Sequence, residues 1–282
     1  MTWRQFQAAQ RLATIGDRFL SYVDQGAGNP VILLHGIPTW GYLWHGVLPT
    51  LAERHRVLVP DLLGFGYSDR SDRFDRSIAV QADAIERWMI ELRVESATVV
   101  GHDIGGGVAL RLATLAPRRV SRLCLIDTVC YDSWPSEMLL PLGRPESSRK
   151  LSAPEAVRLL RRALADGFAS HPDPDLLDGL VAPYATEVGK LSLIRNVAAL
   201  NTNHTTELTP HLPQIAVPTF ILWGEDDRFQ PVRYAERLAN DIPGARLYRV
   251  ADARHFVMFD RPDEVRRRLR GFLDIDVEAR AA

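Results

Sequence analysis

Short runs of apolar residues recur along the chain, separated by polar turns. Val31–Leu34 and Leu123–Ile126 are apolar at every position, a pattern typical of strands covered by helices on both faces. Near the N-terminus, Arg11–Ile15 and Phe19–Asp24 flank a Gly-Asp dipeptide, which predicts a β-hairpin. The same reasoning predicts further strands at Val57–Pro60, Ala97–Val100, Thr219–Trp223 and Arg246–Val250.

Between these runs lie segments whose apolar residues are three and four positions apart, as on one face of a helix. Proline stands at the first turn of one such segment and follows the end of two others. Helices are therefore expected at Ser77–Leu92, Val108–Leu115, Pro231–Asn240 and Pro262–Phe272. This alternation of strand and helix predicts an α/β fold with a doubly wound, mostly parallel sheet.

The alternation stops between about residues 133 and 208. A capping-box pattern at Ser152 and Glu155 predicts a helix that runs through Ala165, and further helices fit Asp175–Val181 and Glu187–Leu200. We expect a core formed by residues 1–131 and 208–282, with a helical cap at 132–207. Such a cap would cover the carboxyl edge of the sheet, where open α/β sheets bind ligands.

The composition narrows the functional classes. A chain of 282 residues, 46% of them hydrophobic, buries a large core in one domain. Its net charge of -1 gives no reason to expect binding to nucleic acid. No apolar stretch approaches the ~18 residues of a membrane span, so a cytoplasmic protein is expected. We expect a small-molecule substrate and neither a metal nor a cofactor. The protein is expected to be a monomer or a homodimer.

The most informative segment is Gly101-His102-Asp103-Ile104-Gly105, which follows a predicted strand and opens a helix. This context fits a nucleophile elbow, G-x-Nuc-x-G, in which glycines avoid clashes at a sharp turn. Asp103 occupies the nucleophile position. A glycine-rich turn can also bind phosphate, but G-x-G-x-x-G order and a P-loop lysine are lacking. The structural alternative is a buried aspartate that caps the helix.

Candidate partners follow in the order nucleophile, acid, histidine. Asp227 lies just beyond the strand Thr219–Trp223, and His255 follows the last strand by a short loop. Asp127, at the end of Leu123–Ile126, is the alternative acid, although such a carboxylate more often bonds loop amides. Asp227 is favoured because a proline follows in its loop at turn spacing.

The segment His35-Gly36-Ile37-Pro38 ends the first buried strand. The backbone N–H of Ile37, together with that of Ile104 at the helix start, is predicted to form an oxyanion hole. His35 is expected to be structural.

With Gly101-His102-Asp103, the motifs His35-Gly36-Ile37-Pro38-Thr39 and Gly64-Phe65-Gly66 resemble the α/β-hydrolase superfamily, and the resemblance covers almost the whole chain. The most similar groups are haloalkane dehalogenases and epoxide hydrolases. The Gly-x-Asp-x-Gly elbow is specific to the aspartate-nucleophile branch, whereas the other motifs are widely shared. The resemblance implies Asp103 as nucleophile, His255 as base and Asp227 as acid.

The chain departs from each subfamily. Haloalkane dehalogenases usually carry Trp after the nucleophile, and many carry Asn after His-Gly, where this chain has Ile104 and Ile37. Fluoroacetate dehalogenases carry Arg at the position of Ile104. Epoxide hydrolases protonate the opening oxygen with two cap tyrosines, for which Tyr184 and Tyr131 are the candidates.

The nucleophile type indicates a reaction. An aspartate, with a pKa near ~3.9, is already ionised at pH 7. Its attack on a saturated carbon that bears a halide or an epoxide oxygen gives an alkyl ester, which His255 can then hydrolyse by activating water. We therefore expect a haloalkane dehalogenase-like hydrolase, with an epoxide hydrolase, an esterase or lactonase, or a ligand-binding protein as alternatives. The candidate hydrogen-bond donors to a leaving group are Trp40, Trp134, Tyr184 and His204. The alternative for each of these side chains is ordinary packing in the core.

Overall fold

The computed structural model describes residues 1–135 and 140–279, and its core is one eight-stranded sheet. The strand order is β1-β2-β4-β3-β5-β6-β7-β8. Only the β1–β2 and β2–β4 pairs are antiparallel. The predicted hairpin and the mostly parallel sheet are thus confirmed. The strands are β1 (Arg11–Ile15), β2 (Arg18–Gln25), β3 (Pro30–Leu34), β4 (Arg56–Pro60), β5 (Ala97–His102), β6 (Val120–Ile126), β7 (Thr219–Gly224) and β8 (Arg246–Val250).

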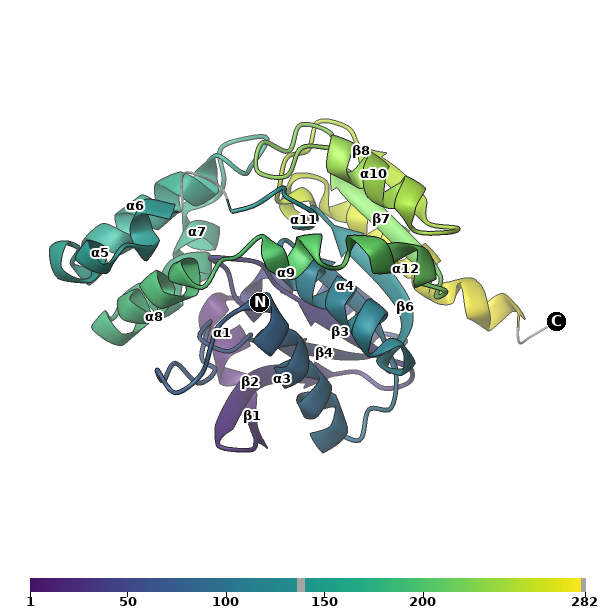
Figure 1. Ribbon diagram of the computed structural model, residues 1–282, viewed down its shortest axis with the longest axis horizontal. Coiled ribbons are helices and arrows are strands. Elements are labelled where there is room, and N and C mark those ends of the chain that lie inside the picture. Colours follow the sequence, from purple (N-terminus) through teal and green to yellow (C-terminus); the bar gives the residue numbers. More distant parts are fainter. Residues whose placement is uncertain (136–139, 280–282) are drawn as a thin grey trace.

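Helices cover both faces of this sheet (Figure 1). α3 and α4 pack together on one face, whereas α2 and α12 contact each other on the opposite face. Among the described residues no helix is both long and apolar enough to cross a membrane. The helices of the core are α1 (Trp3–Ala8), α2 (Leu48–Ala52), α3 (Ile78–Glu91), α4 (Ile104–Leu115), α10 (Arg233–Asp241), α11 (Val257–Asp260) and α12 (Pro262–Ala279).

The helix boundaries agree with the sequence pattern except at two places, the start of α4 and the end of α12, which continues past Phe272 to Ala279. The Ser77 side chain accepts the N–H of Val80 and caps α3, as its place in the sequence predicts. In contrast, α4 begins at Ile104 rather than at Val108. Three consecutive glycines have low helix propensity, but a Cβ on Gly105 would lie 2.5 Å from the backbone oxygen of Leu34, at the end of β3. A Cβ on Gly106 would lie 2.1 Å from Oγ1 of Thr128.

Between β6 and β7 the chain forms a set of helices, which we call the inserted helices: α5 (Pro145–Lys150), α6 (Ala153–Ala165), α7 (Pro174–Val181), α8 (Glu187–Ala198) and α9 (Asn203–Thr206). The predicted capping box begins α6, with the Ser152 N–H donating to Oε2 of Glu155 at 2.8 Å. Figure 1 shows α5 to α8 grouped beside the sheet, whereas α9 contacts α4 in the core.

One buried arginine joins the inserted helices to the core. The Arg76 side chain is only 4% exposed and donates to Oγ of Ser192 at 2.6 Å and Oδ1 of Asn196 at 2.8 Å, both on α8. It also donates to the backbone oxygen of Arg70 at 2.7 Å. Burial lowers the pKa of Arg76 to about 10, so the guanidinium stays charged at neutral pH. These bonds fix α8 over the loop that follows β4.

We expect Arg76→Met to lower the free energy of unfolding by roughly 2–3 kcal/mol, because it leaves several buried acceptors unpaired. Urea denaturation followed by circular dichroism measures this change. Arg195→Met is the matched control, since Arg195 is 42% exposed and its ion pair with Asp72 is a surface one. The control should change stability by less than about 1 kcal/mol. Equal effects of the two variants would contradict this role of Arg76.

Candidate active site

A strained turn between β5 and α4 presents Asp103. Its φ of 53° and ψ of -122° are sparsely populated for a residue with a side chain. A Cβ on Gly101 would lie only 2.4 Å from the backbone oxygen of Gly105, so the turn tolerates no side chain there. This is the geometry of a nucleophile elbow, and the turn leads the Asp103 side chain into a cavity.

A backbone N–H group holds one oxygen of the Asp103 carboxylate. The Ile37 N–H donates to Oδ1 at 2.8 Å, and the Ile104 N–H also stabilises the charged form. Burial raises the pKa of Asp103 above its ordinary value, against the opposing effects of His255 and these two N–H groups. The two N–H groups predicted for an oxyanion hole therefore both face Asp103, and Oδ2 is left for His255 and the cavity.

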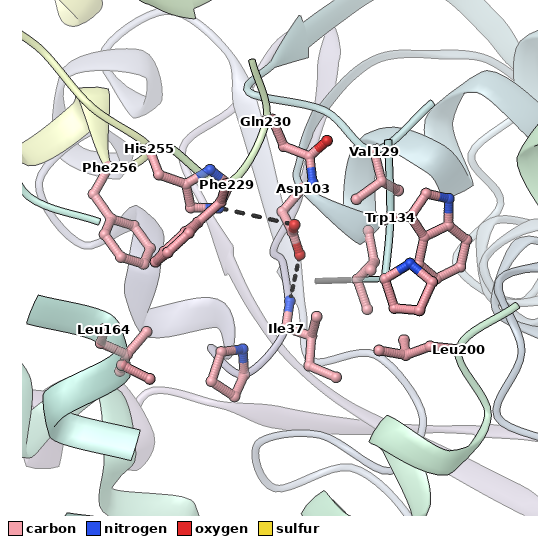
Figure 2. Close-up of a pocket in the computed structure, with 14 residues that line it drawn as sticks. Ile37, Asp103, Val129, Trp134, Leu164, Leu200, Phe229, Gln230, His255 and Phe256 are labelled. Carbon is pink, nitrogen blue, oxygen red and sulfur yellow. Dashed lines mark hydrogen bonds and ion pairs between the residues drawn. The ribbon is translucent and has the colours of Figure 1, made fainter. Parts of the chain in front are cut away.

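His255 lies between two carboxylates, those of Asp227 and Asp103, and Figure 2 shows the side that faces Asp103. Its Nδ1 is 2.9 Å from Oδ2 of Asp227, and its Nε2 is 3.8 Å from Oδ2 of Asp103. Asp227 is itself oriented, because its Oδ1 accepts the N–H groups of Phe229 at 2.7 Å and Gln230 at 3.0 Å. Burial lowers the pKa of His255, but the charges of Asp227 and Asp103 and the hydrogen bond to Asp227 more than offset this, and the pKa is raised.

Asp127 takes a different role from Asp227. It is fully buried, and its Oδ1 accepts the N–H of Gly224 at 2.8 Å. Burial raises its pKa well above the ordinary value, and the nearby charge of Asp227 raises it further. The structure thus places Asp227 against His255 and gives Asp127 the loop-bonding position that the sequence suggests for it. His35 is likewise structural, since its Nε2 accepts the N–H of Leu62 at 2.9 Å.

The cavity beside Asp103 is small and mostly apolar, with a volume of about 50 Å³. Its polar side chains are Asp103, His255 and Gln230. Gln230 is absent from the sequence predictions, because an isolated glutamine three residues after a loop aspartate carries no motif. The apolar lining comes from the core and from the chain between β6 and β7: Ile37, Pro38, Ile104, Val129, Trp134, Pro135, Ala163, Leu164, Leu200, Phe229 and Phe256.

Two of the predicted leaving-group donors lie outside this cavity. The Trp40 indole N–H donates to the backbone oxygen of Gly179 at 2.8 Å. Tyr184 is 1% exposed, and its hydroxyl donates to the backbone oxygen of Thr39 at 3.4 Å. The structure does not bring either donor to the cavity, because their polar atoms satisfy backbone groups where α7 and the turn after it meet the core.

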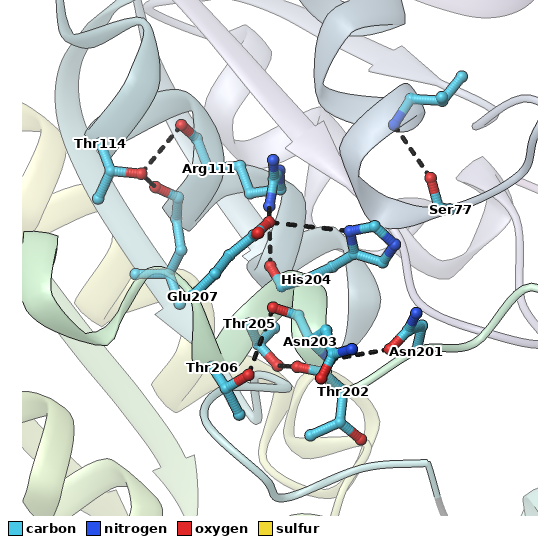
Figure 3. Close-up of polar contacts among 12 residues, drawn as sticks. Ser77, Arg111, Thr114, Asn201, Thr202, Asn203, His204, Thr205, Thr206 and Glu207 are labelled. Atoms are coloured by element: carbon cyan, nitrogen blue, oxygen red, sulfur yellow. Dashed lines mark hydrogen bonds and ion pairs between the residues drawn. The ribbon is translucent and has the colours of Figure 1, made fainter.

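The other two candidates also fail as donors. The Trp134 ring lines the cavity, but its indole N–H donates to Oγ1 of Thr205 at 2.7 Å and points away from Asp103 (Figure 2). His204 belongs to a polar cluster on the α4 side, 3.8 Å from Oε1 of Glu207 (Figure 3). Arg111 joins this cluster by donating to the backbone oxygen of His204 at 3.0 Å. Neither side chain offers a free N–H to the cavity.

Comparison with known proteins identifies the class. The family model described as "alpha/beta hydrolase fold" matches residues 29–262, and the chain belongs to this family. Haloalkane dehalogenase 2 of Mycobacterium tuberculosis is 28% identical, and the match covers 87% of this chain and 88% of that protein. The cis-3-alkyl-4-alkyloxetan-2-one decarboxylase of Shewanella oneidensis is also 28% identical, over 90% of this chain and 85% of that protein.

Solved structures agree. An α/β-hydrolase-fold protein from Burkholderia ambifaria superposes with a TM-score of 0.84 at 28% identity, covering 92% of this chain and 98% of that one. A putative ancestral haloalkane dehalogenase superposes with a TM-score of 0.81 at 23% identity, covering 96% and 100%. The protein is therefore a member of the α/β-hydrolase superfamily, and these relatives support a hydrolase.

We expect Gly36→Ala to displace the Asp103 carboxylate. A Cβ on Gly36 would lie 2.4 Å from Cβ and 2.6 Å from Oδ1 of Asp103. The free energy of unfolding should fall by roughly 1–3 kcal/mol, and hydrolase turnover should fall with it. Gly46→Ala is the matched control, because nothing lies within 4 Å of its added methyl group. If urea denaturation gives the same stability for both variants, the packing of Gly36 against Asp103 is refuted.

Proposed function

We propose that the protein is a haloalkane dehalogenase-like hydrolase in which Asp103 is the nucleophile. One observation carries this proposal: Oδ1 of Asp103 is held by the Ile37 N–H, while Oδ2 lies 3.8 Å from Nε2 of His255 at the cavity. One oxygen is therefore fixed where a carbonyl oxygen must sit, and the other is left to attack.

The first step forms an ester. Oδ2 of Asp103 attacks the saturated carbon, the carbon–halogen bond breaks, and the halide leaves with the bonding electrons. An alkyl ester of Asp103 results, with Oδ1 as its carbonyl oxygen. In the second step, Nε2 of His255 takes a proton from water, and the oxygen attacks Cγ of Asp103.

The N–H groups of Ile37 and Ile104 stabilise the tetrahedral oxyanion that develops on Oδ1, each such donor being worth roughly 2.7–4 kcal/mol. Collapse of this species expels the alcohol, which takes the proton from His255 and leaves Asp103 as a carboxylic acid. Loss of that proton to solvent regenerates the Asp103 carboxylate. The 3.8 Å between Nε2 and Oδ2 is too long for a hydrogen bond and suits a bridging water. Asp227 fixes the imidazole and stabilises its charged form.

The cavity supports a small, uncharged substrate. Within the described part of the chain no lysine, arginine or tyrosine lines it, which disfavours a haloacid, whose carboxylate needs a cation. We propose that residues 132–207 act as the cap, because Ala163 and Leu164 of α6 and Leu200 after α8 close the cavity opposite Asp103.

The alternatives fit this site less well. An epoxide hydrolase would need a proton donor, but Tyr184 is turned to Thr39, and the Tyr131 hydroxyl donates to Oδ2 of Asp241 at 2.7 Å. An esterase with an unreactive Asp103 would need an empty oxyanion hole, whereas Oδ1 of Asp103 fills this one. A protein that only binds ligands has no use for a base aimed at a carboxylate.

A second substrate class, the uncharged oxetan-2-ones, is favoured by one observation. Ile104 and Ile37 provide no side-chain donor for a departing halide. When a carboxylate attacks the saturated ring carbon of an oxetan-2-one, the leaving oxygen stays tethered to the product and needs no separate halide site. A relative named for this class is 28% identical to the chain.

Single turnover in water labelled with ¹⁸O tests the nucleophile. The label should enter the Asp103-containing peptide, and the alcohol formed first should carry the original Asp103 oxygen. His255→Gln should retain the first step, so that this peptide gains the alkyl mass of a 1-haloalkane or of an oxetan-2-one. Asp103→Ala is the control and should gain nothing. Label found only in the alcohol would refute an ester intermediate.

The rate of ester hydrolysis should depend on pH through His255. Only the neutral imidazole can accept a proton, and the pKa of His255 is raised, so the rate should fall as the pH drops through this raised value. Asp227→Asn removes a negative charge that raises the pKa, and the acidic limb should therefore move to lower pH while the rate falls.

Single-turnover rates between pH 5 and 9 measure this shift. Asp263→Asn is the control, because Asp263 is 91% exposed and lies in the first turn of α12. An acidic limb that stays in place in Asp227→Asn would show that another group controls the second step.

A further inference from the structure

Gln230 occupies a fixed position beside the proposed nucleophile. Its backbone N–H donates to Oδ1 of Asp227 at 3.0 Å, and its backbone oxygen accepts the indole N–H of Trp223 at 2.7 Å. The residue is only 3% exposed. The same aspartate that orients His255 thus also holds the backbone from which the Gln230 side chain extends.

The side-chain amide of Gln230 is buried and unused. It lines the cavity, and no hydrogen bond to it is found within residues 1–135 and 140–279. Its Oε1 is fully enclosed and without a partner. Burying an amide without partners costs about 1–3 kcal/mol, so a glutamine at this place destabilises the protein relative to an apolar side chain. Buried unpaired groups of this kind call for a functional explanation.

The orientation of this amide suits a ligand in the cavity. Figure 2 shows the Gln230 side chain extending toward Asp103 from the side opposite Ile37. The amide is nevertheless not bonded to the carboxylate, so it does not reduce the nucleophilicity of Oδ2. Its two N–H donors remain available to a third group.

We propose that the Gln230 amide donates a hydrogen bond to the halide as it leaves. This inference rests on the proposed function and adds the donor that Ile104 and Ile37 do not provide. When Oδ2 of Asp103 attacks, negative charge moves from the carboxylate to the halogen, and a buried donor at the cavity stabilises that charge in an environment of low dielectric. A neutral amide also binds the free halide weakly, which allows its release.

The first step can be measured separately in His255→Gln, where the ester accumulates. The rate of alkylation of the Asp103 peptide is followed by mass spectrometry with 1-chlorobutane, 1-bromobutane and 1-iodobutane. Adding Gln230→Met keeps the length of the side chain and removes both donors. We expect alkylation by the chloride to slow tenfold or more and that by the iodide much less, because chloride is the stronger hydrogen-bond acceptor.

Leu164→Met in the same background is the matched control, since it alters the cavity wall without changing any donor. It should leave the ratio of chloride to iodide rates unchanged. Gln230→Met should also unfold at an equal or higher temperature than the parent, because it removes an unpaired buried amide. If this variant does not fold, Gln230→Leu replaces it.

The outcomes separate the two proposals. Alkylation with an unchanged chloride-to-iodide ratio in Gln230→Met would overturn the role of Gln230 and leave the dehalogenase proposal in place. An equal slowing with all three halides would mean that Gln230 only shapes the cavity, which also overturns its role. No alkylation of Asp103 in His255→Gln by any of the halides would overturn the dehalogenase proposal and this inference with it.

Discussion

The hydrogen bond from the Ile37 N–H to Oδ1 of Asp103 is the contact on which the arrangement of the site depends. It joins the loop after β3 to the elbow after β5, two strands that are neighbours in the sheet. The bond fixes which carboxylate oxygen is buried and which faces His255. Because Gly36 packs directly against Asp103, the loop has little freedom to move away. The sheet therefore fixes the orientation of this carboxylate before any substrate is bound.

The electrostatics of the site follow from burying several ionisable groups together. Asp103, Asp127, Asp227 and His255 lie within the core at this edge of the sheet, each less than a tenth exposed. Full burial favours the protonated form of Asp127, so the charge beside His255 is carried by Asp227. Asp127 then accepts the N–H of Gly224, and Asp227 contacts the imidazole of His255. This division explains why two aspartates, each directly beyond a strand, can coexist without strong repulsion.

The sequence was sufficient for the fold and for the placement of Asp103, Asp227 and His255, because both rest on local patterns. Strands apolar on both faces, a glycine-flanked elbow and acidic residues just beyond strands all leave marks within a few residues. The apolar spacing alone placed the start of α4 at Val108, because glycines carry no such pattern, whereas the elbow motif placed it at Ile104, where the helix begins. Similarly, no local pattern shows that the indole of Trp134 is bonded to Thr205.

Donor availability is the property that separates a side chain in the cavity wall from one that takes part in the chemistry. Trp134 and Gln230 both line the cavity, yet the N–H of Trp134 is committed to Thr205, whereas no bond within the described residues engages the Gln230 amide. Residue type alone would favour Trp134 over Gln230 as the halide donor, because an indole N–H is a familiar donor to halide. Burial without a partner destabilises the fold, and a stable protein retains such a group most readily where a ligand supplies the missing bond. The unpaired amide is therefore stronger evidence about the substrate than the aromatic ring beside it.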